Sequence, residues 1–305
     1  MSNDNNNATN NPAADVPIHG PQAGFESVDA EVRNIPGITV ENLVPPEVGT
    51  FLAGESISVL QVNGKDNRDA SKGEVGALTF EAAKQEEETT EGFLGKLLDG
   101  LSEGERSKLD IIVIASSAEL ATLNGVGSDH KRAVDTGKHA ISGFKQALKD
   151  RGLDEGAIVN TRGLHGGDIF ETEALLDVPF LHDISEEGEK YREAMVEKYG
   201  ATGFGIWAAY EKDKGDDRKL REQTGMPGPV ETADAVADFM HVSQGFAEAY
   251  QEANPDRRLI IWAIGHYDSL THYIKRDMLG EDIRDTLMPM DKLSGVVIHN
   301  HNSGS

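Results

Sequence analysis

The feature that most constrains the fold is an uninterrupted apolar run at residues 259–264, followed at once by Gly265 and His266. Six apolar residues in a row, several of them β-branched, predict a strand buried on both faces, as in the middle of a parallel sheet. His266 then stands at the carboxyl end of that strand, which is where ligands bind in open α/β sheets. The simpler alternative is that His266 only caps the following helix.

Further strands and helices alternate along the chain. Strands are expected at residues 57–62, 110–117, 157–160 and 295–298, the last at an edge. Apolar residues at helical spacing predict four helices. The first starts near Thr79, and the second starts after Ser128 and ends at Gly152. The other two cover residues 186–199 and 230–253. This alternation predicts an α/β fold with a mostly parallel central sheet.

The expected organisation is one domain with two irregular segments before it. Residues 1–24 are rich in Asn, Ala and Pro and poor in apolar side chains, which predicts a disordered tail. Residues 25–55 contain three prolines among scattered apolar groups and are expected to form an irregular arm. Residues 56–305 are expected to form a single α/β domain with an insertion at about 163–230.

The formal net charge of −24 limits the partners that this chain can have. Such a charge repels phosphate backbones and anionic lipid, so neither nucleic acid nor a membrane is expected as a partner. A small anionic ligand is compatible, because local arginines and helix amino ends act at short range while distant charges are screened. With no signal peptide and no apolar run of about 20 residues, a cytoplasmic location is expected.

The absence of cysteine removes several kinds of chemistry. The 305 residues include none, so disulfides, thiolate nucleophiles and cysteine-bound metals are excluded. Histidines near the carboxyl end, or His165 with Asp168, have ligand types without a diagnostic metal spacing such as His-Glu-x-x-His. We therefore predict neither a metal nor a cofactor. A homo-oligomer is compatible with the sequence.

Three short motifs, each following a predicted strand, occur in a recognisable order. They are Asn63-Gly64, then Arg132-Ala133 with Thr136 at the start of a helix, then Gly265-His266. In this order they resemble the histidine phosphatase (phosphoglycerate mutase-like) superfamily. Its members carry Arg-His-Gly, Arg-Ala-x-x-Thr and Gly-His or Ser-His at these points. The resemblance implies a three-layer sandwich of the histidine phosphatase type.

The resemblance also implies roles for individual residues. In this superfamily one histidine attacks phosphorus while arginines and a second histidine surround the phosphoryl oxygens. By analogy, Arg132 and His266 would bind phosphate. Asn63 takes the nucleophile's position, where an amide cannot form a phosphohistidine, and Val62 takes the place of the first arginine.

Other residues could complete such a site. Lys65 and Arg68 lie just after Asn63 and could restore positive charge, although a solvated loop is the plainer interpretation for both. His165 lies roughly where the superfamily carries a loop with an acidic proton donor. Asp168, Glu171 and Glu173 nearby could take that role, and Glu171 is the residue we assign to it. His130 and His165 are the other histidines that could act as nucleophile, with packing and solvation as their plainer roles.

Three functions follow from these observations. The first is a weak or inactive phosphatase, a pseudoenzyme that binds a small phosphorylated ligand. The second is an active phosphomonoesterase with an unorthodox nucleophile or an activated water, so whether the chain is an enzyme stays open at this point. The third, an unrelated hydrolase or metal enzyme, is disfavoured because neither Gly-x-Ser-x-Gly nor a phosphate-loop motif is present.

Overall fold

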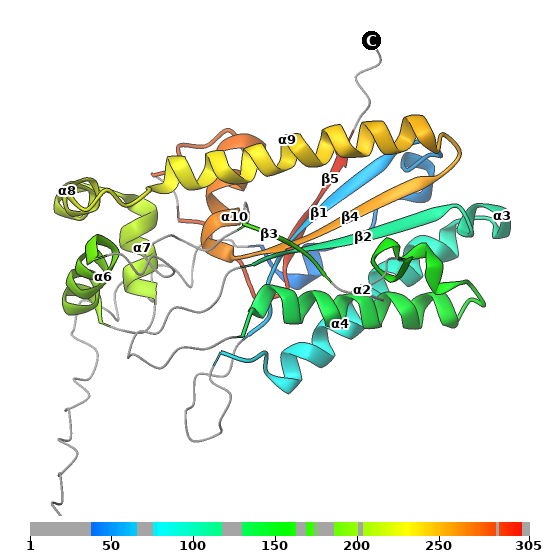
Figure 1. The fold of residues 1–305 in the computed structure, drawn as a ribbon, viewed down its shortest axis with the longest axis horizontal. Coiled ribbons are helices and arrows are strands. Elements are labelled where there is room, and N and C mark those ends of the chain that lie inside the picture. Colours follow the sequence, from blue (N-terminus) through cyan, green and yellow to red (C-terminus); the bar gives the residue numbers. More distant parts are fainter. Residues whose placement is uncertain are drawn as a thin grey trace, which may run out of the picture.

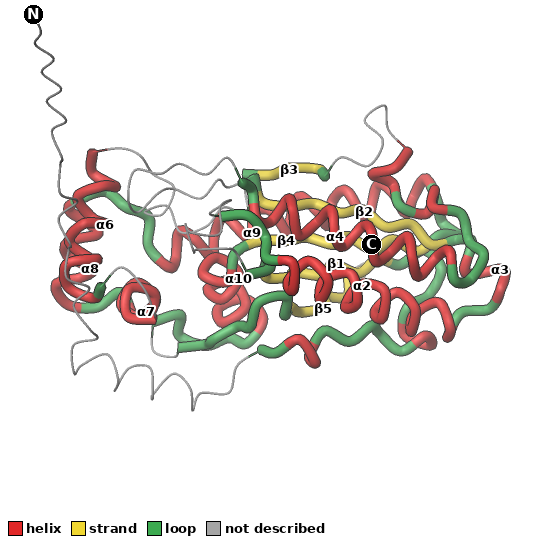
Figure 2. The backbone as a smooth tube through the Cα atoms, turned by 90° about the horizontal axis from the view of Figure 1, so that it is seen from below, coloured by secondary structure: helices red, strands yellow, loops and turns green. Residues whose placement is uncertain are grey.

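The computed structural model describes residues 38–65, 76–117, 130–162, 169–173, 175, 186–200, 204–284 and 287–300. A five-stranded sheet runs through this part of the chain in the order β3-β2-β4-β1-β5 (Figures 1 and 2). Its strands are β1 (Ser56–Val62), β2 (Leu109–Ser116), β3 (Phe170–Thr172), β4 (Arg258–Gly265) and β5 (Gly295–Asn300). The first four are parallel and β5 is antiparallel to β1. The predicted α/β fold with a mostly parallel sheet is confirmed.

The strand predicted from the apolar run is central, as expected. β4 lies between β1 and β2, and all of its residues are buried. Trp262 and Ile264 belong to one apolar cluster and Ala263 to another, so alternate residues serve opposite faces of the sheet. Trp262 packs edge-on against Phe93 and Phe144, with ring centroids 5.0 and 5.1 Å apart.

Helices cover both faces of the sheet (Figure 1). On one face lie α2 (Phe80–Gly100) and α4 (Arg132–Lys149), whose apolar side chains share a cluster with Val59, Trp262 and Ile264. On the other lie α9 (Pro229–Ala253) and α10 (Tyr267–Tyr273), which share a cluster with Leu60 and Val62. Thr79 caps α2 by accepting a hydrogen bond from the Ala82 amide, as the expected start near that residue implies.

The predicted strand at residues 157–160 is wrong. Two 3-10 helices, Glu155–Ala157 and Val159–Arg162, occupy this stretch, with one isolated bridge from Ile158 to Ile111. The physical reason is the Asn160 side chain, which accepts from the Val113 amide at 2.8 Å and donates to the Val113 carbonyl at 2.9 Å. A side-chain amide thus satisfies the β2 backbone where a neighbouring strand would have paired.

The helix expected after Ser128 begins later than predicted. Ser128 lies outside the described residues, and α4 starts at Arg132 with Lys131 as its N-cap. Its end agrees with the prediction, because Gly152 follows with a φ of +66° and the Leu153 amide bonds back to the Leu148 carbonyl at 3.0 Å.

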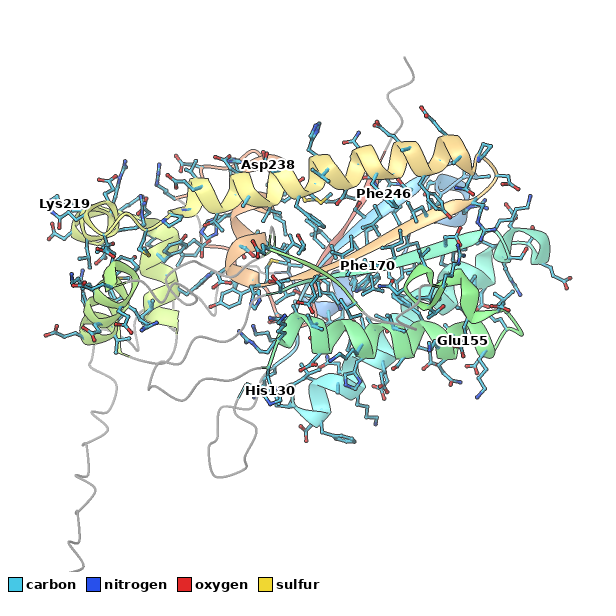
Figure 3. The ribbon with its side chains drawn as sticks, in the orientation of Figure 1. His130, Glu155, Phe170, Lys219, Asp238 and Phe246 are labelled. Atoms are coloured by element: carbon cyan, nitrogen blue, oxygen red, sulfur yellow. The ribbon has the colours of Figure 1, made fainter. Side chains whose placement is uncertain are left out.

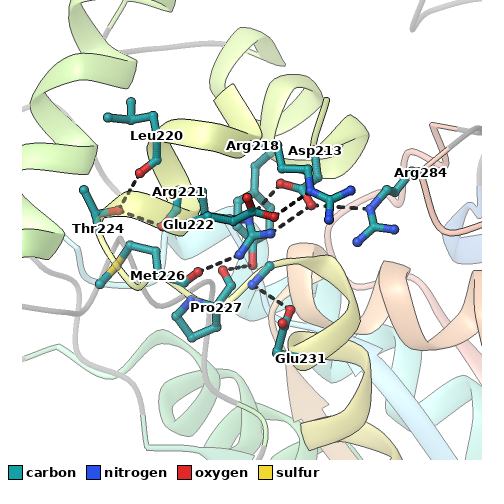
Figure 4. A network of polar contacts seen from close by, with 12 residues as sticks. Asp213, Arg218, Leu220, Arg221, Glu222, Thr224, Met226, Pro227, Glu231 and Arg284 are labelled. Atoms are coloured by element: carbon teal, nitrogen blue, oxygen red, sulfur yellow. Dashed lines mark hydrogen bonds and ion pairs between the residues drawn. The ribbon is translucent and has the colours of Figure 1, made fainter. Parts of the chain in front are cut away.

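The described part of the expected insertion contains the sheet strand β3, the start of α9 and three helices of its own. These helices are α6 (Glu186–Tyr199), α7 (Phe204–Lys212) and α8 (Gly215–Gln223), and the predicted helix over 186–199 is confirmed. A polar network stabilises the connection between α7 and α8 (Figure 4). Arg221 donates to both carboxylate oxygens of Asp213 at 2.7 and 3.0 Å and to the Met226 carbonyl at 2.8 Å. Arg284 reaches Asp213 at 3.3 Å, which joins a later segment to this network.

The remaining described elements are short. They are the helix α3 (Glu103–Arg106), the 3-10 helices Val40–Asn42 and Val48–Thr50 and a π-helical turn at Ile274–Met278. The expected tail, residues 1–24, and the arm up to residue 37 lie outside the described residues. None of the helices in the described ranges is both long and apolar enough to span a bilayer.

The contact between α2 and α4 leads to a matched pair of predictions. A Cβ added to Gly143 would lie 2.2 Å from Thr90 Oγ1 and 2.3 Å from the Glu87 carbonyl oxygen, whereas one added to Gly92 meets nothing within 4 Å. Gly143→Ala should therefore lower the free energy of unfolding by about 1–3 kcal/mol through overpacking. Gly92→Ala should raise it by about 0.5–1 kcal/mol through helix propensity. Chemical denaturation measures both, and a neutral Gly143→Ala would contradict the close approach of the two helices.

Candidate functional site

The carboxyl ends of β1 and β4 bring two predicted site residues together. Val62 pairs with Gly265, and the Asn63 amide donates to the Gly265 carbonyl at 2.9 Å. Strand alternation turns Asn63 and His266 toward the face that α2 and α4 cover. Both are almost fully buried, and Asn63 Nδ2 lies 3.0 Å from His266 Nδ1.

A lysine on the other side of Asn63 fixes the direction of this hydrogen bond. Lys292 Nζ donates to Asn63 Oδ1 at 3.4 Å, so the carbonyl end of the carboxamide faces the lysine and the NH₂ end faces the imidazole. Asn63 Nδ2 therefore donates, and His266 Nδ1 accepts. The proton of the neutral ring is then on Nε2, which makes that atom a hydrogen-bond donor and removes its nucleophilic lone pair.

Helix capping explains only the backbone of His266. Its carbonyl oxygen accepts from the amides of Ser269 and Leu270 at 3.2 and 3.0 Å and from Ser269 Oγ at 2.9 Å. The imidazole makes no capping bond to α10. The capping alternative therefore leaves the contact between the imidazole and Asn63 unexplained.

Helix α4, which begins at the predicted residue Arg132, contacts the Asn63-Gly64 loop through Thr136. The Thr136 hydroxyl accepts from the Gly64 amide at 3.0 Å and donates to the Arg132 carbonyl at 2.8 Å. Arg132 itself is 5% exposed. Thr136 thus links the first two motifs and brings the amino end of α4, where the helix dipole favours anions, next to the Asn63-Gly64 loop.

The position of Gly64 keeps this loop close to α2. A Cβ there would lie 2.4 Å from Leu78 Cδ1 and 3.3 Å from Ala82 Cβ. A larger residue would have to displace the Leu78 methyl group and move slightly away from Ala82 in the first turn of α2.

The remaining predicted site residues are Lys65, Arg68, His165 and Glu171. Lys65 is exposed, and its carbonyl accepts from the Thr79 amide at 2.9 Å. Arg68 and His165 lie outside the described residues. Glu171 lies on β3 and forms a 2.6 Å ion pair with Lys131, the residue before Arg132. The proton-donor role of Glu171 remains a prediction.

His130 lies immediately before Lys131, at the amino end of α4, and Phe170 lies on β3 (Figure 3). Among the described residues, no group of three or more His, Asp or Glu side chains is arranged to hold a metal ion.

Val62, which the resemblance aligns with an arginine, faces away from Asn63 and His266. It is fully buried in an apolar cluster with Leu270, Ile274 and Met290, on the face covered by α9 and α10. An arginine at this position would bring an uncompensated guanidinium into apolar contacts. Position 62 therefore supplies no positive charge to this edge of the sheet.

Lys292 and Tyr267 belong to the site and were missed in the sequence. The Lys292 ammonium lies 4.7 Å from the centroid of the Tyr267 ring and 3.4 Å from Asn63 Oδ1. Neither residue belongs to a motif, and 229 positions separate Lys292 from Asn63. Only the sheet order, which places β5 beside β1, could have indicated this neighbour.

Comparison with known proteins gives distant structural similarity. No protein-family model and no curated protein matches the sequence. A phosphoglycerate mutase from Bacillus anthracis str. Sterne is 13% identical, with a TM-score of 0.42 over 81% of this chain and 88% of that chain. A structure described as mycobacterial hydrolase 1 is 15% identical, with a TM-score of 0.39 over 80% of this chain and 92% of the other. Similarity of this degree shows neither a family nor an activity for this chain.

Proposed function

We propose that the protein binds a small phosphorylated ligand at the carboxyl edge of β1 and β4, and that it is a weak or inactive phosphatase. The fold would be a three-layer sandwich of the histidine phosphatase type with an altered first motif. The observation that supports the proposal is the 3.0 Å contact of Asn63 Nδ2 with His266 Nδ1. If the resemblance holds, a hydrogen-bond donor then stands where the superfamily has its nucleophile.

The chemistry of the edge suits a phosphoryl group. In the proposed site His266 would donate from Nε2–H and Arg132 would supply a guanidinium fork, while α4 presents its amino end to the Asn63-Gly64 loop. These groups act at short range, so a net charge of −24 spread over the molecule does not prevent binding. No cofactor or metal is needed for such binding.

The same contacts argue against transfer through a phosphohistidine. Asn63 has no nucleophilic nitrogen, and the hydrogen bond from Asn63 keeps the proton on His266 Nε2. An active phosphomonoesterase would need His266 to change tautomer, another nucleophile such as His130 or His165, or water activated by a group such as Glu171. The ion pair of Glu171 with Lys131 occupies one oxygen of that carboxylate.

Arg132→Met should weaken the binding of inorganic phosphate by about 100-fold, because two charge-assisted hydrogen bonds are lost at a buried position. Isothermal titration calorimetry measures the dissociation constant. Arg132→Lys keeps the charge but not the two parallel N–H donors of the guanidinium. Its dissociation constant for phosphate should therefore lie between those of wild type and Arg132→Met. Arg218→Met on α8 is the matched control, since Arg218 pairs only with exposed Glu222 in the described structure and should leave phosphate binding unchanged.

Turnover of an aryl phosphate by the same proteins decides between the two functions. We expect none above background for the wild type. Chelator-resistant turnover that Arg132→Met abolishes would establish the phosphomonoesterase instead. Wild type that binds no phosphate would refute the proposed function.

A further inference from the structure

The turn before β5 is attached to the end of β1 by backbone hydrogen bonds. The Leu293 amide donates to the Val62 carbonyl at 3.1 Å, and the Val62 amide donates to the Ser294 carbonyl at 2.8 Å. Within the turn, the Ser294 hydroxyl and amide both donate to the Asp291 carbonyl, at 2.7 and 3.2 Å. Residues 291–294 therefore have a fixed position beside Asn63.

Leu293 adopts a strained backbone conformation in this turn. Its φ is +66°, in the left-handed region that a branched side chain adopts at a cost of about 1–2 kcal/mol. Its side chain is 1% exposed, so packing holds the residue there. Residues in strained backbone conformations cluster at active sites and at segments that clamp ligands. The residue before Leu293 is Lys292, whose ammonium lies at Asn63 and Tyr267.

A series of buried hydrogen bonds through Gln61 links the strained turn to β4 and α2. Gln61 Nε2 donates to the Leu293 carbonyl at 3.2 Å and to Glu86 Oε2 at 2.7 Å, and Trp262 Nε1 donates to Gln61 Oε1 at 2.7 Å. Burial raises the pKa of Glu86 well above its usual range, and the hydrogen bond from Gln61 acts in the opposite direction. The Gln61 carboxamide is fixed at both ends, and with it the carbonyl of Leu293.

We propose that Lys292 contacts the ligand and supplies the cationic group that position 62 lacks, an inference that rests on the proposed phosphate binding. Val62 points toward α9 and α10, whereas Lys292 reaches the edge from the turn beside β1. An ammonium carries three N–H donors, so it can hold Asn63 Oδ1 and donate to a phosphoryl oxygen. Lys292 also sets the orientation of the Asn63 carboxamide, and through it the tautomer of His266.

A purely structural role is the competing explanation. The cation–π contact with Tyr267 and the bond to Asn63 could serve only to hold the turn in place. The two roles differ in what they change. A structural lysine affects the melting temperature of the ligand-free protein, whereas a ligand-contacting lysine affects the dissociation constant of phosphate.

The experiment measures phosphate binding by calorimetry and ligand-free melting for three variants. Lys292→Met should raise the dissociation constant of inorganic phosphate about 10-fold, the value of one charge-assisted hydrogen bond. Lys292→Arg retains the charge and should stay within about threefold of wild type. Lys149→Met, at the far end of α4 and exposed, is the control that should change nothing.

The outcomes separate this inference from the proposed function. If Arg132→Met no longer binds phosphate while Lys292→Met binds it with wild-type affinity, the proposed role of Lys292 is overturned. The proposed phosphate site is then still supported. A lower melting temperature for Lys292→Met with unchanged affinity also overturns it. If wild type binds no phosphate, the proposed function fails, and this inference fails with it.

Discussion

Replacing either member of the buried Lys275–Glu211 pair should lower the free energy of unfolding by about 3–5 kcal/mol, since removing one partner leaves the other uncompensated. Both side chains are 0% exposed, and Lys275 Nζ lies 2.5 Å from Glu211 Oε1. Lys275 also donates to the Ile283 carbonyl at 2.7 Å, and Glu211 Oε1 accepts from the Met288 amide at 3.1 Å. The pair thus joins α7, the π-helical turn and the segment that leads to β5.

Burial shifts the pKa values of the two side chains in opposite directions. It raises the pKa of Glu211 to about 7 and lowers the pKa of Lys275, while their mutual attraction opposes both changes. Neither group is well solvated, so neither tolerates the loss of the other. The π-helical turn at Ile274–Met278 is the local irregularity in the backbone from which Lys275 reaches this position.

A double-mutant cycle tests the pair. Glu211→Leu and Lys275→Met should each be strongly destabilising in urea denaturation, and the double variant should recover most of the loss because no charge is then buried. Lys190→Met is the matched control, since its pair with Glu186 is 59% and 77% exposed and should cost less than about 0.5 kcal/mol. Additive losses in the double variant would contradict the coupling.

The sheet was predictable wherever its strands are apolar. The runs at 110–117 and 259–264 became β2 and β4, because a strand buried on both faces leaves an uninterrupted apolar signal. β3 leaves no such signal, since Phe170 and Glu171 are exposed. The wrongly predicted strand at 157–160 does contain an apolar run. However, the Asn160 side chain takes the hydrogen bonds of the β2 backbone that a neighbouring strand would have made. The spacing of apolar residues does not reveal such a replacement.

The site was predictable in part for a similar reason. Asn63 and His266 follow parallel strands that pair directly, so element order alone places them at one edge. Lys292 depends on the antiparallel β5 and on a strained turn, neither of which has a sequence motif. The direction of the hydrogen bond between Asn63 and His266 depends on Lys292, and so the tautomer could not be inferred either.

His272 should make the folded protein sensitive to acid. It is 0% exposed on α10, its Nδ1 donates to the Asp268 carbonyl, and its ring packs edge-on against Tyr210. Burial lowers the pKa of His272 to about 3, and the nearby Lys275 contributes in the same direction. The unfolded state therefore binds more protons than the folded state at every pH from about 6.5 down to about 3, and stability falls as the pH falls through this window.

The size of this effect follows from the same linkage. Between about pH 7.5 and about pH 4.5, His272 should remove roughly 2–3 kcal/mol from the free energy of unfolding. The glutamine in His272→Gln cannot take up a proton. Between these two pH values the free energy of unfolding of the variant should therefore fall by roughly 2–3 kcal/mol less than that of wild type, whatever the stability of the variant at neutral pH. His241→Gln, at an exposed position on α9, should follow the wild-type pH dependence. Should the Gln variant fail to fold, NMR of wild type gives the same answer: a His272 ring that becomes protonated near pH 6.5 in the folded protein would contradict the assignment of a buried, neutral imidazole.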